Sequence, residues 1–504
     1  MKTHSAALRA SCALFLTGSA FAAGPDVARI HGLDAKTLLG DGTGVVIGII
    51  DSGVDDTHPA LTGTVTGGLS RMVAEANFVT SEPSNTGDDV FGHGTAVAGV
   101  LMSRNATFYS VATDARFVNA RVLDGANSFS TDAWIVNGVG FALSNGANLL
   151  NLSLGYFNSN TSGNSRLSLM ADYVVSQLHI PMVVSAGNAG NAANHLPQGP
   201  GEAFDVISAA STQSSLYNKI VSSSSYGPTT DGRTKPDLAA PGDQINTASS
   251  NWETQADFQL WSGTSFASPN IAAIMAAQME YGATHALSRD PLVLKATLLN
   301  SAEKVSNRTN AAWAPNASTV TGFLTVTSPL DSQSGAGQID GLKLYDQYSP
   351  GEMSPGDVAA TGWDLATVSG ISSLVYHVGM LAAGSTLAAT LTWNRKVGWT
   401  DNGNGRLDSA DSFALLETLD NLDLSILRNG SLVARSISTL DNLEHLYLTG
   451  ILEGDYSLRV NRLSGGGTSE EFGLAWAGTA VPEPASAGLL LAAALLAVAK
   501  RRRS

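Results

Sequence analysis

Short apolar runs rich in Val and Ile alternate with segments of helical spacing through the first half of this chain. The apolar runs are 44–51, 115–123, 147–155, 181–188 and 205–212. The helical segments are 93–102, 134–146 and 165–179. Continuous apolar strands separated by helices predict a parallel β-sheet with helices on both faces.

Polar residues directly after these strands are the first candidates for a functional site. In open parallel sheets, sites form at the carboxyl ends of the strands. The candidates at those positions are Asp51, Ser153 and Asn188.

After about Pro350 the apolar pattern changes to a period of two, with turn signals between the runs. Examples are 387–394, 422–438, 446–460 and 472–478. This pattern predicts an antiparallel β-sandwich. We expect 303–330, rich in Asn, Thr, Ala and Ser, to be a surface insertion near the end of the first domain, and 461–471 to be a loop or linker.

The N-terminus has the features of a secretory signal peptide. The basic residues Lys2 and Arg9 come before an apolar stretch, which ends in the small-residue pattern Ala-Phe-Ala at 20–22. The single cysteine, Cys12, lies within this segment, so the exported chain relies on its core and forms no disulfide. Only about twenty residues then precede the strand at Gly44, so we expect no folding propeptide domain.

The C-terminus ends in an apolar run, 485–499, followed by the basic residues 500–503. Fifteen helical residues span about 22 Å, short of a hydrocarbon core of roughly 30 Å. The basic cluster favours the cytoplasmic side of the inner membrane. We therefore predict a short transmembrane helix over 485–499.

The net charge of the whole chain is −15. Removal of the basic end segments makes the exported part more negative still. An acidic protein of this kind is a poor partner for nucleic acid or for anionic membrane surfaces.

Three separated segments carry residues that can act together as a nucleophilic site. Asp51 ends a predicted strand. His93, which has a glycine on either side, begins a predicted apolar helix, and Ser265 precedes a second helix. An imidazole can take the serine proton while a buried carboxylate holds the imidazole in the required tautomer. Local rules alone begin the second helix at Ser268–Pro269 and leave Ser265 in the loop before it.

The motifs around these residues resemble those of subtilisin-like serine proteases, the subtilases. DSGV surrounds Asp51, GHGT surrounds His93 and GTSFASP surrounds Ser265, with supporting stretches at 151–155, 185–188 and 236–242. The resemblance covers roughly residues 30–345. It implies an α/β fold: a subtilisin-like domain with a mostly parallel β-sheet flanked by helices, here followed by a smaller all-β sandwich.

The resemblance also implies a role for each matching residue. Asp51 orients the imidazole, His93 is the general acid and base, Ser265 attacks the peptide carbonyl, and Asn188 donates a side-chain N–H to the oxyanion. It places Ser265 at the N-terminus of its helix, so helical geometry should begin near Thr264 or Ser265. The substrate backbone would lie between two walls, formed by Ser153, Leu154 and Gly155 and by Ser185, Ala186 and Gly187.

The implied chemistry needs no cofactor, although subtilases often bind structural calcium. The loop 399–411 resembles a calcium loop through Asn402, Asn404, Asp408 and Asp411, but an EF-hand register would begin at Thr400. A solvated hairpin loop is the other interpretation. The metal ligands of the chain therefore stay unassigned.

The C-terminal tail resembles the PEP-CTERM sorting signal of Gram-negative bacteria, with Pro-Glu-Pro, a short membrane segment and an Arg cluster. The predicted organisation is a signal peptide (1–22), a peptidase domain (25–347), a sandwich similar to the pre-peptidase C-terminal domain (350–478) and a sorting segment (481–504).

The predicted function is an exported, surface-sorted serine endopeptidase. Its partners would be polypeptide substrates and, through the tail, a membrane-bound transpeptidase. The alternative is a catalytically silent surface or matrix-binding module on the same fold.

Overall fold

A computed structural model describes residues 25–83, 86–157, 160–213, 219–320 and 322–479. Its larger part is a seven-stranded sheet in the order β2-β3-β1-β4-β5-β6-β7, with every neighbouring pair parallel. The strands are β1 (Val46–Asp51), β2 (Met72–Asn77), β3 (Arg116–Arg121), β4 (Leu149–Leu152), β5 (Met182–Ser185), β6 (Ile207–Thr212) and β7 (Leu238–Pro241). The predicted parallel sheet is confirmed, and β2 and β7 are additional to the predicted strands.

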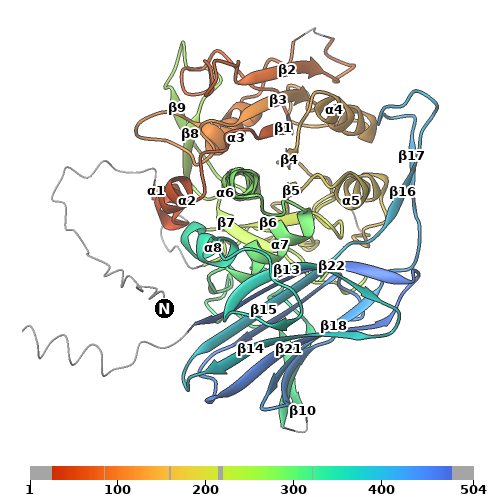
Figure 1. The fold of residues 1–504 in the computed structure, drawn as a ribbon. Coiled ribbons are helices and arrows are strands. Elements are labelled where there is room, and N and C mark those ends of the chain that lie inside the picture. Colours follow the sequence, from red (N-terminus) through yellow and green to blue (C-terminus); the bar gives the residue numbers. More distant parts are fainter. Residues whose placement is uncertain (1–24, 84–85, 158–159, 214–218, 321, 480–504) are drawn as a thin grey trace, which may run out of the picture.

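Helices cover both faces of this sheet, as Figure 1 shows. They are α1 (Pro25–Arg29), α2 (Gly32–Leu38), α3 (His93–Met102), α4 (Asp132–Ser144), α5 (Arg166–Leu178), α6 (Thr264–His285), α7 (Pro291–Asn300) and α8 (Gly341–Tyr348). Successive strand residues point to opposite faces. Accordingly, Ile49 packs in the core that contains α3 and α6, whereas Ile50 packs in the core that contains α4 and α5.

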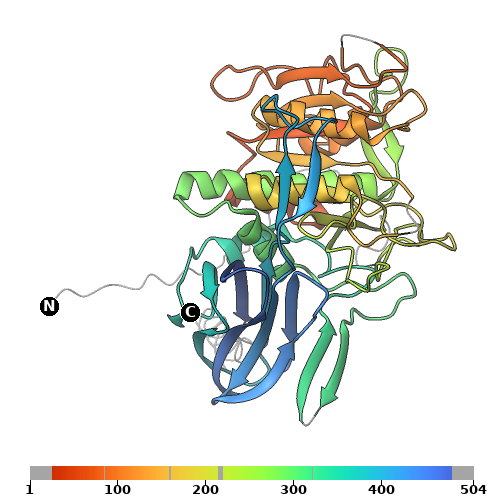
Figure 2. The ribbon, with the colours of Figure 1, turned by 90° about the vertical axis from the view of Figure 1, so that its right-hand side faces the viewer.

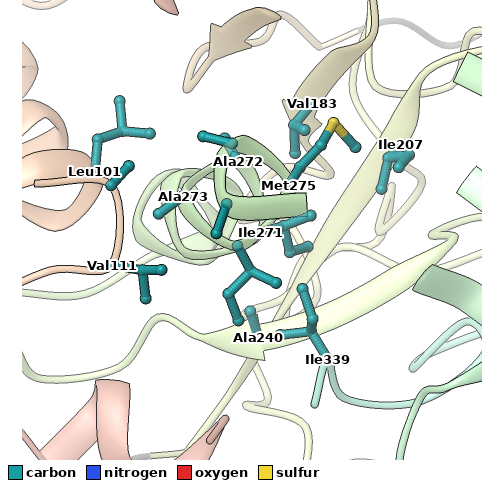
Figure 3. Close-up of a cluster of buried hydrophobic side chains, with 14 of the residues drawn as sticks. Leu101, Val111, Val183, Ile207, Ala240, Ile271, Ala272, Ala273, Met275 and Ile339 are labelled. Atoms are coloured by element: carbon teal, nitrogen blue, oxygen red, sulfur yellow. The ribbon is translucent and has the colours of Figure 1, made fainter. Parts of the chain in front are cut away.

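The long helix α6 runs through the centre of the first core (Figure 3). Ile271 and Met275 are fully buried and lie among Val183 of β5, Ile207 of β6 and Ala240 of β7. A helix that is apolar all round is expected only where protein surrounds it. This burial fixes the N-terminal end of α6 relative to the carboxyl ends of the strands.

The smaller part is a sandwich of a seven-stranded sheet, β10-β11-β19-β18-β21-β14-β12, and a four-stranded sheet, β13-β22-β15-β20. The strands are β10 (Asn316–Val320), β11 (Phe323–Ser328), β12 (Gly356–Asp357), β13 (Thr361–Ser369), β14 (Ser373–Leu381), β15 (Thr386–Trp393), β18 (Asn421–Arg428), β19 (Ser431–Ser436), β20 (Leu443–Leu448), β21 (Gly454–Ser464) and β22 (Ser469–Thr479). Neighbouring pairs are antiparallel, except β11–β19 and β12–β14. The four-stranded sheet packs on α7, where the Thr392 hydroxyl donates to the Leu292 carbonyl at 3.0 Å.

Two sequence expectations for this region are wrong. The segment 303–330 is more than an insertion of the first domain, because β10 and β11 extend the seven-stranded sheet of the sandwich. The segment 461–471 is no linker: β21 continues to Ser464 and β22 begins at Ser469, so only a short turn joins them. Its three consecutive glycines form that turn.

Two further hairpins leave the main sheets. Strands β8 (Ile245–Ala248) and β9 (Phe258–Trp261) form one that precedes α6. Strands β16 (Val397–Thr400) and β17 (Ser412–Leu415) form the other, which extends from the sandwich along the first domain (Figure 2). Its Trp399 and Phe413 rings contact Tyr173 of α5.

Candidate active site

Three elements bring the predicted triad together. Asp51 is the last residue of β1, His93 is the first residue of α3, and Ser265 is the second residue of α6. All three side chains are almost completely buried, with His93 6% and Ser265 8% exposed. His93 and Ser265 line the same cleft.

Asp51 and His93 form a short hydrogen bond. His93 Nδ1 lies 2.7 Å from Asp51 Oδ1, and the same oxygen accepts a bond from the Ser52 amide. Burial lowers the pKa of the imidazole, but the charge of Asp51, its hydrogen bond and the charge of Asp89 outweigh burial, so the pKa lies above its ordinary value. With Nδ1–H donated to the carboxylate, Nε2 is left to accept a proton.

The start of α6 agrees with the expectation from the family resemblance, and the local expectation of a start at Pro269 is wrong. The helix begins at Thr264, and Pro269 lies inside it. Proline has no N–H, so the carbonyl of Ser265 loses its helical partner. The Ser153 hydroxyl donates to that carbonyl at 2.7 Å and replaces the missing bond.

Ser265 stands in the first turn of α6, where backbone N–H groups have no partner within the helix. The partial positive charge of a helix N-terminus favours an anion there. Within the described residues the Ser265 hydroxyl makes no hydrogen bond to the imidazole; such bonds are often long before a substrate is bound.

The carboxamide of Asn188 is held in one orientation by α6. Its Oδ1 accepts bonds from the Thr264 amide at 2.9 Å and from the Thr264 hydroxyl at 3.1 Å. The oxygen is therefore turned toward the helix, and the Nδ2 donor is left for the cleft. Asn188 lines that cleft together with Ser265.

The cleft has a volume of about 340 Å³. Five of the six predicted wall residues line it: Ser153, Leu154, Gly155, Ser185 and Gly187. The sixth, Ala186, is not among the lining residues. It is fully buried, its amide bonds to the Ala209 carbonyl, and its carbonyl accepts from the Gln198 amide.

Gln198 and Tyr156 also line the cleft, and no sequence motif indicated Gln198. The backbones of Tyr156 and Gly199 bond to each other in both directions. The Gln198 side chain lies against Gly155 and Gly187, where an added Cβ would come within 3.0 Å and 2.6 Å of it, respectively. Both walls thus need glycine at these positions to leave room for Gln198.

Asp89 is a further acidic group near the triad. It accepts bonds from the Ser52 hydroxyl at 2.8 Å and from the amides of Gly92 and Thr95, which open α3. Burial raises its pKa despite these bonds. Its place four residues before His93 is the signal that could have identified it, since Asp is a common acceptor at helix N-termini.

Aromatic rings cover the other sides of the imidazole. Trp261 and Phe266 have ring centroids 5.9 Å and 5.5 Å from that of His93. These rings restrict the access of water to the base, which strengthens electrostatic interactions around it.

The loop 399–411 is a hairpin loop whose carboxylates are used within the loop. Asp411 accepts from Trp399 Nε1 and from the amides of Asn402 and Asp408. Asp408 accepts from the Asn402 side chain and the Ala410 amide. In the part of the chain that the structure describes, no three His, Cys, Asp or Glu side chains form a group suited to a metal ion.

Both predicted end segments, 1–22 and 481–504, lie outside the described residues, and with them the proposed helix 485–499. In the residues that are described, no helix is both long enough and apolar enough to cross a membrane.

Comparisons with known proteins give matches in two parts of the chain. Residues 42–322 match the subtilase family (peptidase S8), and residues 480–503 match the PEP-CTERM protein-sorting motif. Thermitase from Thermoactinomyces vulgaris is 34% identical over 55% of this chain and 87% of its own length. Subtilisin from Bacillus pumilus is 32% identical over 52% and 86% of the two chains.

For subtilisin E from Bacillus subtilis the identity is 32%, over 51% of this chain and 62% of that protein, which is less than two-thirds of its length. A solved cold adapted subtilisin-like serine proteinase aligns with a TM-score of 0.42 and 29% identity, over 54% of this chain and 88% of the other. Since the family match spans more than half of the 504 residues, the chain belongs to the subtilase family and is a serine endopeptidase.

Proposed function

We propose that Asp51, His93 and Ser265 form the catalytic triad of an exported endopeptidase. The observation that carries the proposal is the buried 2.7 Å bond between His93 and Asp51 at a cleft that Ser265 also lines. An oriented imidazole beside a serine hydroxyl is the arrangement that makes this weak nucleophile reactive.

The reaction then proceeds in two halves. His93 Nε2 takes the proton of Ser265 Oγ as the oxygen bonds to the peptide carbonyl carbon. The oxyanion accepts hydrogen bonds from Asn188 Nδ2 and from the backbone N–H of Ser265. The intermediate collapses as the imidazolium gives its proton to the leaving amine, which leaves an acyl-enzyme. Water activated by His93 releases the acid and restores Ser265.

The cleft supports binding of an extended peptide. Ser153 to Gly155 form one wall, and Ser185 and Gly187 contribute to the other. Extended peptides bind by main-chain hydrogen bonds to exposed strand edges. No cofactor has a part in these steps.

Labelling with a fluorophosphonate tests the function. We expect the wild-type protein to be labelled at Ser265 and to cleave denatured protein, and Ser265→Ala to retain the fold but lose both properties. A folded wild-type protein that takes no label and cleaves no peptide is the result expected of the alternative, a silent surface or matrix-binding module.

We further propose that the PEP-CTERM tail sorts the enzyme to the cell surface after export. A membrane-bound transpeptidase would cut the tail near Pro482–Pro484 once the short apolar segment has held the chain in the inner membrane. The mass of the mature protein tests this proposal. A product that retains residues 485–504 contradicts it.

A further inference from the structure

Arg395 reaches from the sandwich into the subtilase domain. It lies just after β15 and is 4% exposed. Its Nε lies 2.9 Å and its Nη2 2.6 Å from Oδ2 of Asp172, on α5. Its main-chain N–H donates to Asp205 Oδ1 at 2.9 Å.

The two carboxylates form a buried acidic pair, and the positive charges of Lys295 and Arg395 both act on Asp205. The Asp205 amide donates to Asp172 Oδ1 at 2.9 Å, and Asn442 of the sandwich donates to Asp205 Oδ1 at 2.8 Å. Burial and the charge of Asp172 raise the pKa of Asp205 well above its ordinary value. Removing one partner of such a buried group leaves an uncompensated charge.

The same guanidinium also contacts Phe204, Gly163 and Asn164 of the subtilase domain. It lies 4.1 Å from the centroid of the Phe204 ring, donates to Asn164 Oδ1 at 3.0 Å and bonds to the Gly163 carbonyl. Arg233 contacts the same Phe204 ring, at 3.7 Å. Cations packed on a buried aromatic ring fix its position as well as contributing attraction.

The segment that Arg395 contacts at Phe204 and Asp205 continues into a wall of the cleft. Its first residues are Gln198 and Gly199. Tyr156 and Gly199 pair through their backbones, and Gln198 donates to the carbonyl of Ala186. Arg395 therefore contacts one end of a described segment, at Phe204 and Asp205, whose other end, at Gln198, lines the cleft.

We propose that Arg395 is a positioning residue for the walls of the substrate cleft, so that the sandwich takes part in substrate binding. This inference rests on the endopeptidase function proposed above. It makes the cleft of the full chain depend on a side chain that the subtilase domain itself does not supply.

The test is steady-state kinetics of Arg395→Met in the full chain. The substrate is a tetrapeptide p-nitroanilide, whose residues all occupy the acyl side. We expect KM to rise about tenfold with kcat changed less than threefold. The substitution should displace the walls that bind the substrate but leave the positions of the triad residues unchanged. The rate of labelling by a small fluorophosphonate, which barely engages the walls, should stay unchanged. A second variant, Arg395→Met with Asp172→Asn, also removes one of the buried charges, and it is measured if the single variant does not fold.

Lys304→Met is the matched control. Lys304 contacts His445 of the sandwich at 3.0 Å, also between the two parts of the molecule, but it does not line the cleft. We expect this variant to keep the wild-type KM. The KM of Arg395→Lys should lie between those of the wild type and Arg395→Met, because lysine keeps the positive charge but lacks the forked geometry of arginine.

A folded Arg395 variant with a wild-type KM overturns the proposal. So does an equal rise in KM for Lys304→Met, or a parallel fall in the labelling rate, because either result indicates a general loosening. Failure of the catalytic proposal is separate, since it shows in the wild-type protein as absent labelling and absent hydrolysis.

Discussion

Replacement of Asn188 by Ala tests the oxyanion assignment most directly. The carboxamide oxygen is turned to Thr264, so Nδ2 is the group that the substitution removes from the cleft. Loss of one oxyanion donor in subtilisin costs about 10²–10³ in turnover, which corresponds to about 2.7–4 kcal/mol. We expect a fall of this size in kcat and little change in KM, because the donor acts on charge that develops only in the transition state.

The effect on stability should be much smaller. Asn188 is exposed to the cleft, so water can replace its oxygen as the acceptor for the Thr264 amide. The net value of an exchanged hydrogen bond is about 0.5–1.5 kcal/mol. Urea unfolding should therefore show a loss of that order, well below the loss of transition-state stabilisation.

Asn188→Asp separates the two roles of the side chain. It keeps an oxygen for Thr264 but has no donor, and its negative charge repels an oxyanion. We expect near wild-type stability and a kcat no higher than that of the Ala variant. A loss of kcat below tenfold in Asn188→Ala, or a change confined to KM, would refute the assignment.

Three other predictions concern groups around the site and the domain junction. The value of kcat/KM should rise with pH as His93 loses its proton, with a midpoint above the ordinary pKa of histidine. Asp89→Asn should move this midpoint to lower pH, because it removes one of the charges that raise the pKa of His93. A midpoint that does not move contradicts this prediction. Ser153→Ala should lower the free energy of urea unfolding by about 1–3 kcal/mol, because the buried Ser265 carbonyl is left without the hydroxyl that donates to it. Ser153→Thr keeps a hydroxyl donor and should lower this free energy less. Burial lowers the pKa of Lys304 to about 7, so the unfolded state binds the proton more tightly between pH 7 and 10.5 and stability should rise with pH across that window; Lys304→Met should remove the rise.

The sequence predicted the strands that carry continuous apolar runs and missed those that do not. All six residues of β2 are only half-buried, and its sequence MVAEAN has no apolar run. Strand β7 has four residues and ends in proline. Strand β10 is mostly polar, and β11 has three apolar residues within a segment rich in Asn, Thr, Ala and Ser, which favours a surface insertion. Strand identity in these cases depends on pairing with a neighbour, which a single segment does not encode.

The candidate site residues that stand in short sequence motifs could be predicted, whereas those that reach the cleft through tertiary contacts could not. Asp51, His93, Ser265 and Asn188 stand in short motifs, and the structure brings them to one place. Gln198 reaches the cleft only because two glycines of other segments leave space for it. Ala186 was expected in the wall because its neighbours are there, but both its backbone groups are used inside the protein.

The start of α6 shows how one local rule fails for an identifiable reason. A proline after a serine predicts a helix start, because an interior proline leaves a carbonyl without its partner. Here that carbonyl belongs to Ser265, and Ser153, 112 positions away in the chain, donates to it. Asn151 bonds to both Ser153 and Ser268, so the first turn of α6 is tied to the end of β4 on two sides. The interior proline thus leaves the carbonyl of Ser265, the proposed nucleophile, without a helical partner, and Ser153, which lines the cleft, donates to it. This hydrogen bond connects a wall of the proposed substrate cleft to the residue that would attack the substrate.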